Sequence, residues 1–259
     1  MTRTLLIRPG AIGDAIVSLP ALEFLRADFT EVWAPSANLP LFGGVADQVR
    51  SIASSGLDRV GVFDEPLPLA LREFDRIVSW YGANRDEFRE AVDELPFEFH
   101  RALPPTGCDI HAIDFYLRQV GAPLGGVPRV PASAMKRDFI AIHPFSGSTR
   151  KNWPFEEFQQ VAVGMPLPVE WAATEFGVNR FEDLACVADW LASARAYLGN
   201  DSGITHLAAA VGTPVVSLFG PTDPAVWAPR GASVTILKME ETTVAQVSEI
   251  LAACVRLHN

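Results

Sequence analysis

The chain has 259 residues, of which 49% are hydrophobic, 20% charged and 10% aromatic, and this composition excludes a disordered, fibrous or disulfide-dense protein. The length fits one large domain or two of modest size, and we expect two. The formal net charge of −10 opposes a function that depends on broad attraction to nucleic acid or anionic lipid, although it is compatible with a local basic pocket.

The cysteines and the apolar runs indicate the compartment. Cys108, Cys186 and Cys254 lie far apart without a CxxC pair, so the sequence predicts neither a zinc ribbon nor a disulfide framework. The apolar run near the N-terminus is too short for a secretion signal, and the longest apolar stretch, 207–221, is shorter than a membrane span. We therefore expect a cytoplasmic protein without a transmembrane segment.

In the first half of the chain, short apolar runs alternate with helical patterns. The expected strands are residues 4–7, 31–35, 60–63 and 74–80. A loop at 8–13 separates the first strand from a helix over 14–27, which Pro20 should kink or shift. This alternation predicts βαβ units on a parallel sheet, with ligands at the carboxyl ends of the strands.

A stretch rich in glycine and proline, 121–131, is the best candidate for a linker. The alternation then starts again, with expected strands at 139–143, 169–173, 196–199 and 214–219, and with expected helices from Pro154, over 181–194 and over 202–211. The sequence therefore predicts an α/β protein with two domains, 1–132 and 133–259.

Several phosphate- and metal-binding motifs are absent from the sequence: GxxxxGK[ST], GxGxxG, HExxH and Asp-x-Asp. Their absence disfavours P-loop hydrolysis and the usual dinucleotide-binding fingerprint. It also disfavours a transferase that holds a sugar diphosphate through a divalent metal, because such a site needs clustered oxygen ligands. We expect phosphate to be held in another way.

One glycine-flanked turn connects a predicted strand to a predicted helix in the second half. The N–H groups at this helix start, around Ser202 and Gly203, suit an anion. In an equal alternative, Asp201 or Ser202 caps the helix and His206 packs on its first turn. Spacing alone leaves both alternatives open.

A similar loop in the first half runs from Gly10 to Asp14. The glycines at 10 and 13 allow a close approach to the backbone, and Asp14 lies where the loop meets the helix. Asp14 is therefore either a functional carboxylate or an ordinary helix cap.

Lysine is scarce, because Lys136, Lys151 and Lys238 are the only three in the chain. Lys151 lies in a polar loop between a predicted strand and a helix that starts near a proline. It is either a flexible point charge that reaches a phosphate or a solvated loop cation, and Arg150 shares both alternatives. His143, which ends the strand, is a better candidate for a core or loop histidine than for a catalytic one.

Three separated segments resemble glycosyltransferase family 9, the heptosyltransferases. They are the loop and helix over 6–22, the Lys-x-Trp-Pro segment within 143–158, and the Asn-Asp-Ser-Gly to Phe-Gly-Pro-Thr-Asp-Pro signature within 199–229. The resemblance implies a GT-B fold of two facing Rossmann-like domains, with the acceptor mainly on the N-terminal domain and the nucleotide sugar mainly on the C-terminal domain. The chain is shorter than typical members, above all at 174–180.

The resemblance also implies roles for individual residues. Asp14 matches the catalytic carboxylate and Lys151 the phosphate-binding lysine, which we also count as catalytic. Further residues expected at the donor are Ser146, Glu175, Glu182, Asp201, Ser202, Gly203 and His206. Gly10 and Gly13 belong to the loop on the acceptor side.

The leading hypothesis is an inverting, metal-independent transfer of a sugar, such as heptose from ADP-heptose, to a hydroxyl of a lipopolysaccharide-core-like acceptor. It requires no cofactor and no nucleic-acid partner, and it allows peripheral contact with the inner face of a membrane. One alternative is a non-catalytic protein that binds nucleotide sugars or docks a partner. Another is a nucleotide-sugar hydrolase or epimerase.

Overall fold

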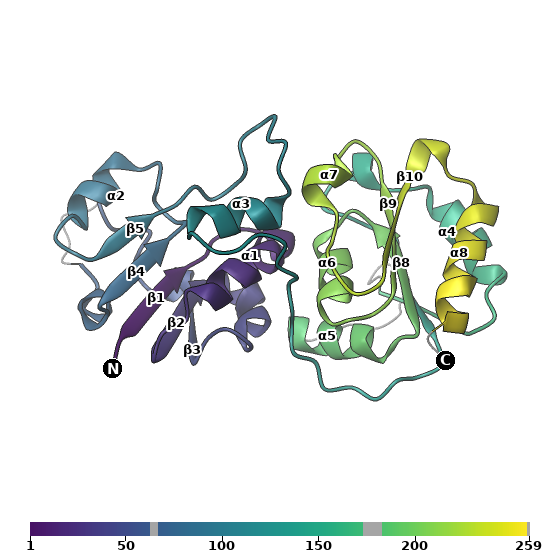
Figure 1. Cartoon of the computed structure of the whole chain (residues 1–259), viewed down its shortest axis with the longest axis horizontal. Helices are drawn as coiled ribbons and strands as arrows, with labels where there is room; N and C mark the ends of the chain where they lie inside the picture. The colour runs from purple at the N-terminus through teal and green to yellow at the C-terminus, as the bar shows by residue number, and fades with distance from the viewer. Residues whose placement is uncertain (63–66, 173–182, 258–259) are drawn as a thin grey trace. The chain divides into compact units, whose positions relative to one another are not determined.

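The computed structural model describes residues 1–62, 67–172 and 183–257 and divides the chain into two compact units (Figure 1). Unit 1 consists of Met1–Cys108 with Ala112–Gly126, and unit 2 of Asp109–His111 with Val127–Asn259. Each unit contains one parallel sheet covered by helices. The chain is therefore a two-domain α/β protein, as its alternating pattern predicts.

The sheet of unit 1 has five strands in the order β3-β2-β1-β4-β5. Their bounds are β1 Arg3–Ile7, β2 Phe29–Ala34, β3 Gln48–Ser51, β4 Arg76–Ser79 and β5 Phe97–Phe99. All neighbouring strands are parallel. The α-helices are α1 Ile12–Phe24, α2 Asp86–Ala91 and α3 Ala112–Gln119, and short 3-10 turns cover Ser36–Phe42, Ile52–Ser54 and Leu69–Glu73.

Both faces of this sheet are buried, which explains why β1 is apolar throughout. Leu5 and Ile7 point into a core that includes Trp33, Ile77 and Phe88. Leu6 alternates with them and is also fully buried, because α1 and α3, which contact each other, cover the opposite face.

The sheet of unit 2 has the strand order β10-β9-β8-β6-β7 and is also parallel. Its strands are β6 Ile140–His143, β7 Val169–Trp171, β8 Ala196–Asn200, β9 Val215–Phe219 and β10 Val234–Lys238. Its α-helices are α4 Phe155–Val163, α5 Leu184–Ser193, α6 Gly203–Ala210, α7 Pro224–Trp227 and α8 Val244–Leu257, with 3-10 turns at Thr149–Lys151 and Met239–Glu241. Figure 1 shows α4 and α8 on one side of the sheet and α5 and α6 on the other.

The two sheets differ in topology. Numbered within its own unit, the first has the order 3-2-1-4-5 of a Rossmann half, and the second has the flavodoxin-like order 2-1-3-4-5. The strand order reverses between β1 and β4 in unit 1 and between β6 and β8 in unit 2. At such a switch point neighbouring connections leave the sheet toward opposite faces, so a ligand finds space there at the carboxyl edge.

The prediction of a strand at 60–63 is wrong for residues 60–62, and residue 63 lies outside the described residues. Residues 59–62 form turns, with Gly61 at a φ of +73° and so close to the backbone of Glu87 and Phe88 that a Cβ would clash. Val60 is nevertheless buried, because it belongs to the core of unit 1. The third strand is instead β3, a half-exposed edge strand. Pro20 does not shift the helix, since α1 extends past it.

Within the described ranges, no helix has both the length and the apolar character that crossing a membrane requires.

His143 ends β6 next to Gly199 of β8. Its Nδ1 is buried and has no hydrogen-bond partner among the residues that the structure describes, and burial lowers the pKa of the imidazole to about 4. Its ordinary value is 6.5, so between pH 6.5 and about 4 the unfolded chain binds a proton that the folded chain does not. Acidification through this window therefore destabilises the fold.

We expect the free energy of unfolding to fall by the order of 1–3 kcal/mol more in the parent than in His143→Gln when the pH is lowered from 6.5 to 4.5. Urea unfolding of both proteins at several pH values measures the two slopes. His143→Gln is the reference, because it shares every other titrating group with the parent. Identical slopes would show that His143 titrates normally in the folded state.

Candidate functional site

The carboxyl edge of each sheet carries one group of the predicted site residues, and each group lies at its sheet's switch point. In unit 1 the loop after β1 contains Gly10 and leads into α1, whose second residue is Gly13 and whose third is Asp14. Asp14 Oδ2 accepts the backbone N–H of Ala11 at 3.0 Å. The carboxylate thus satisfies one of the free donors at the start of the helix.

The turn before Asp14 requires a glycine. Gly10 has a φ of +115°, and a Cβ on it would lie 2.9 Å from both Cβ and Oδ2 of Asp14. Its carbonyl accepts Asn38 Nδ2 at 3.0 Å. Any larger residue at 10 would therefore displace the carboxylate.

In unit 2 the predicted phosphate-binding residues come from two loops that flank the switch point. Lys151 lies in the loop after β6 and Asp201 directly follows β8, and Lys151 Nζ contacts Asp201 Oδ2 at 2.7 Å. The Asp201 side chain is 7% exposed and that of Lys151 34% exposed. Lys151 is therefore not a freely solvated loop cation, since a nearly buried carboxylate holds its ammonium.

Asn200 fastens the loop that carries Lys151. It is fully buried at the end of β8, its Nδ2 donates to the carbonyl of Pro144, and its Oδ1 accepts the N–H of Trp153 at 3.0 Å. One amide side chain thus holds both ends of the loop 144–153. The sequence analysis missed this role, although Asn200 is part of the Asn-Asp-Ser-Gly signature.

The start of α6 combines the two alternatives that spacing left open. Ser202 is the N-cap and its hydroxyl accepts the N–H of Thr205, while His206 is 6% exposed on the first turn. Asp201 does not cap the helix. No acceptor within the described residues serves the N–H groups of Ser202, Gly203 and Ile204, so they remain available to an anion.

Two further loops complete this edge. Ser146 Oγ lies 2.8 Å from both the carbonyl of Ser148 and Oδ1 of Asn152, inside the loop of Lys151. A Cβ on Gly220, directly after β9, would lie 3.5 Å from the carbonyl of Arg150. The loops after β6, β8 and β9 therefore meet around Lys151.

Half-buried aromatic rings lie beside this edge in the same unit. Phe145 and Phe155 are stacked with centroids 6.1 Å apart, and Phe155 contacts Trp171 at the end of β7 at 5.6 Å. Their spacing in the sequence shows no period that would have indicated a shared surface. They provide an apolar flank to the polar loops.

Two of the predicted donor residues, Glu175 and Glu182, lie outside the described residues, as does the connection 174–180.

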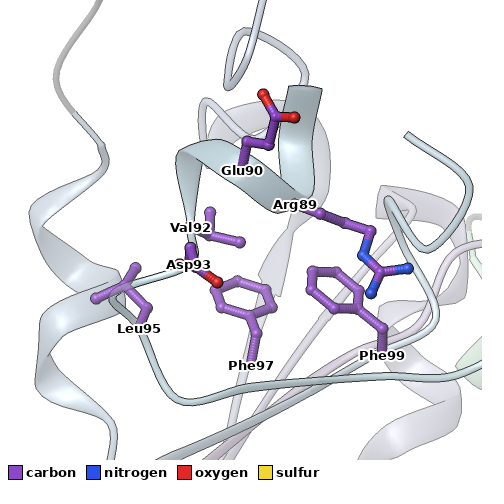
Figure 2. A pocket seen from close by; sticks show the side chains of 7 residues that line it. All are labelled: Arg89, Glu90, Val92, Asp93, Leu95, Phe97 and Phe99. Atoms are coloured by element: carbon purple, nitrogen blue, oxygen red, sulfur yellow. The ribbon is translucent and has the colours of Figure 1, made fainter. Parts of the chain in front are cut away.

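A hollow of about 470 Å³ lies in unit 1 beside the edge strand β5, and Figure 2 shows the side chains that line it. Phe97 and Phe99 line it, and the Arg89 guanidinium lies 5.3 Å from the ring of Phe99. It contains none of the predicted site residues.

Known proteins resemble this chain both in sequence and in structure. Residues 182–252 match the profile of glycosyltransferase family 9 (heptosyltransferase). The chain is 39% identical over 196 residues to lipooligosaccharide heptosyltransferase 2 of Haemophilus influenzae, covering 64% of this chain and 56% of the relative. It is 50% identical over 186 residues to lipopolysaccharide heptosyltransferase 1 of Pseudomonas aeruginosa, covering 59% of this chain and 51% of that relative.

The chain thus spans about half the length of the curated relatives that it matches. Among solved structures, the ADP-heptose lipopolysaccharide heptosyltransferase II of E. coli superposes with a TM-score of 0.75 at 17% identity, over 99% of each chain. At that identity the superposition establishes the fold, and the expected GT-B class is confirmed.

Proposed function

Because the chain is a relative of glycosyltransferase family 9 in sequence and has a GT-B fold, we propose that it is a glycosyltransferase that uses a nucleotide-diphosphate sugar. The observation that carries this proposal is the contact of Lys151 with Asp201 next to the free N–H groups of α6. The names of the relatives favour heptose from ADP-heptose as the donor group and a lipopolysaccharide core as the acceptor.

In this proposal, Lys151 meets the diphosphate. An ammonium group has three N–H donors, and the contact with Asp201 uses one of them. The other two, together with the N–H groups of Ser202 and Gly203, suit the oxygens of a diphosphate whose charge grows as it leaves. The half-buried rings of Phe145, Phe155 and Trp171 offer an apolar aromatic surface of the kind that a nucleobase prefers.

Asp14 is proposed as the general base. Its Oδ2 accepts the N–H of Ala11, whereas Oδ1 has no hydrogen-bond partner among the described residues, so capping and proton transfer use different oxygens. Asp14 accepts the proton of an acceptor hydroxyl while that oxygen bonds to the anomeric carbon. The bond from this carbon to the diphosphate breaks on the opposite side, and the configuration inverts.

A lipid-linked acceptor would bring the protein to the cytoplasmic face of the inner membrane as a peripheral partner. The charge of −10 requires that such contact be local rather than spread over the surface.

We expect Asp14→Asn to lower kcat by about 10²–10⁴-fold while ADP affinity stays within about twofold, because the amide oxygen keeps the cap but cannot accept the proton. Single-turnover rates with ADP-heptose and a heptose-free lipopolysaccharide core measure the change. Asp47→Asn is the matched control, since Asp47 Oδ2 also accepts one backbone N–H, that of Thr30 at 2.8 Å. A mutant that loses folding or ADP binding along with turnover would assign Asp14 a capping role only.

We expect Lys151→Ala to weaken ADP binding about tenfold to a hundredfold and to lower turnover more, because the lost contact strengthens as the diphosphate departs. Calorimetry and single-turnover rates measure the two effects. Lys238→Ala is the control, since the Lys238 side chain is exposed and its ion pair with Glu241 is long, with 3.9 Å between Nζ and Oε1. Lys136 is unsuitable because its Nζ donates to the carbonyl of Ala194. Equal and negligible effects at 151 and 238 would remove the phosphate site from this edge.

Metal independence is tested by turnover in excess EDTA. We expect the rate to be unchanged, because Lys151 and backbone N–H groups take the role of a cation at the diphosphate. A rate that falls to background and returns with Mg²⁺ or Mn²⁺ would overturn this part of the proposal. ADP binding without any transfer would favour the non-catalytic alternative, and acceptor-independent release of ADP would favour a hydrolase.

A further inference from the structure

The side chain of Arg8, directly after β1, is almost completely buried, with 1% exposed. Its Nε donates to Ser18 Oγ at 2.9 Å, Nη1 to the carbonyl of Pro9 at 2.6 Å, and Nη2 to the carbonyl of Asp14 at 2.7 Å and to Tyr116 Oη at 3.0 Å. All of these acceptors are uncharged. Throughout the part of the chain that the structure describes, no carboxylate oxygen lies within 4.0 Å of the guanidinium.

A buried cation without a contacting anion is costly, because its desolvation is not offset by an ion pair. A buried arginine is therefore a poor way to gain stability at this position. The guanidinium instead fixes the local geometry, since its planar group holds several acceptors in place at once.

The acceptors of Arg8 enclose the turn that carries Asp14. Two of them, the carbonyls of Pro9 and Asp14, belong to the two ends of this turn. A further acceptor, Tyr116 Oη, ties the turn to α3, and this hydroxyl donates to the carbonyl of Ala102 at 2.8 Å. The Arg8 Cζ also lies 4.8 Å from the Tyr116 ring centroid.

Tyr116 is suited to this role. Burial raises the pKa of its hydroxyl to about 12, although the nearby Arg8 charge opposes the rise, so the phenol keeps its proton at neutral pH. It can therefore accept from Arg8 and donate to Ala102 at the same time.

We propose that Arg8, supported by Tyr116, is the positioning residue for Asp14: the guanidinium holds the turn 9–14 so that one carboxylate oxygen caps α1 and the other faces the substrate. This inference rests on the proposed function, because it assigns Arg8 a purpose in proton transfer. A lysine could not substitute, since a single ammonium cannot reach both carbonyls and the phenol with the geometry of the fork.

The first test is a double-mutant cycle with Arg8→Lys, Tyr116→Phe and Asp14→Asn, measured as kcat and donor KM with ADP-heptose and a heptose-free lipopolysaccharide core. We expect Arg8→Lys to lower kcat about tenfold or more with donor KM unchanged, and to lower it less than twofold when Asp14 is already asparagine. Tyr116→Phe should act in the same direction and serves if Arg8→Lys folds poorly.

Arg85 and Tyr81 provide the control pair. Arg85 Nη1 donates to Tyr81 Oη at 3.0 Å in the same unit, and Arg85 Nη2 donates to the carbonyl of Val60 at 3.1 Å, so this pair holds the turn at 59–62 and not the turn of Asp14. Arg85→Lys and Tyr81→Phe should leave kcat within twofold of the parent. Equal losses of kcat from Arg8→Lys with and without Asp14 would overturn the positioning role. A parent-like rate in Asp14→Asn would instead overturn the proposed function.

The second test needs no turnover. Amide hydrogen exchange of the segment 10–16 reports the turn directly, and we expect it to be at least fivefold faster in Arg8→Lys and Tyr116→Phe than in the two control variants. Unchanged protection of this segment in folded Arg8→Lys would show that other contacts hold Asp14 and would overturn the inference. This outcome can be read even if the protein shows no transferase activity.

Discussion

The divergence of connections at the switch point of a parallel sheet is the constraint on which both groups of site residues depend. Strands on either side of that point send their chains toward opposite faces, so backbone cannot fill the space above the carboxyl edge. Asp14 reaches this space from β1 in unit 1. Lys151 and Asp201 reach it from β6 and β8 in unit 2. The two sheets have different strand orders, and each still places its polar loops where its own order reverses.

In both units a single buried polar side chain at the end of a strand fastens the loop with the charged residue. Arg8 binds both ends of the turn of Asp14, and Asn200 binds both ends of the loop of Lys151. Both partners of Asn200 and two of the four acceptors of Arg8 are backbone groups, which have fixed positions once the strands have paired. A loop tied in this way loses little further entropy when a ligand binds, which favours pre-organised recognition.

The sequence predicts the buried strands and the loops that follow them well, because apolar runs followed by glycine and polar residues mark the ends of parallel strands. It misses three of the four edge strands. The strands β3, β5 and β10 are partly exposed and lack the buried apolar run by which β1 and β9 are recognised, whereas the edge strand β7 was predicted. Arg8 and Asn200 were missed because their partners are backbone groups or lie as far away as Tyr116, 108 residues along the chain.

The separation of Lys151 from Asp201 has a consequence for the order in which the protein assembles. The two residues are 50 positions apart, and their strands become neighbours only after the chain has crossed the sheet through β7 and α5. Closing such a loop costs entropy before any stabilising contact has formed, so pairings between residues far apart in the sequence form late. Until β8 docks against β6, Asn200 cannot hold the Lys151 loop and α6 has no fixed start. In the proposed function, nucleotide binding therefore requires a completely folded second unit, and a nascent or partly folded chain would not sequester the donor.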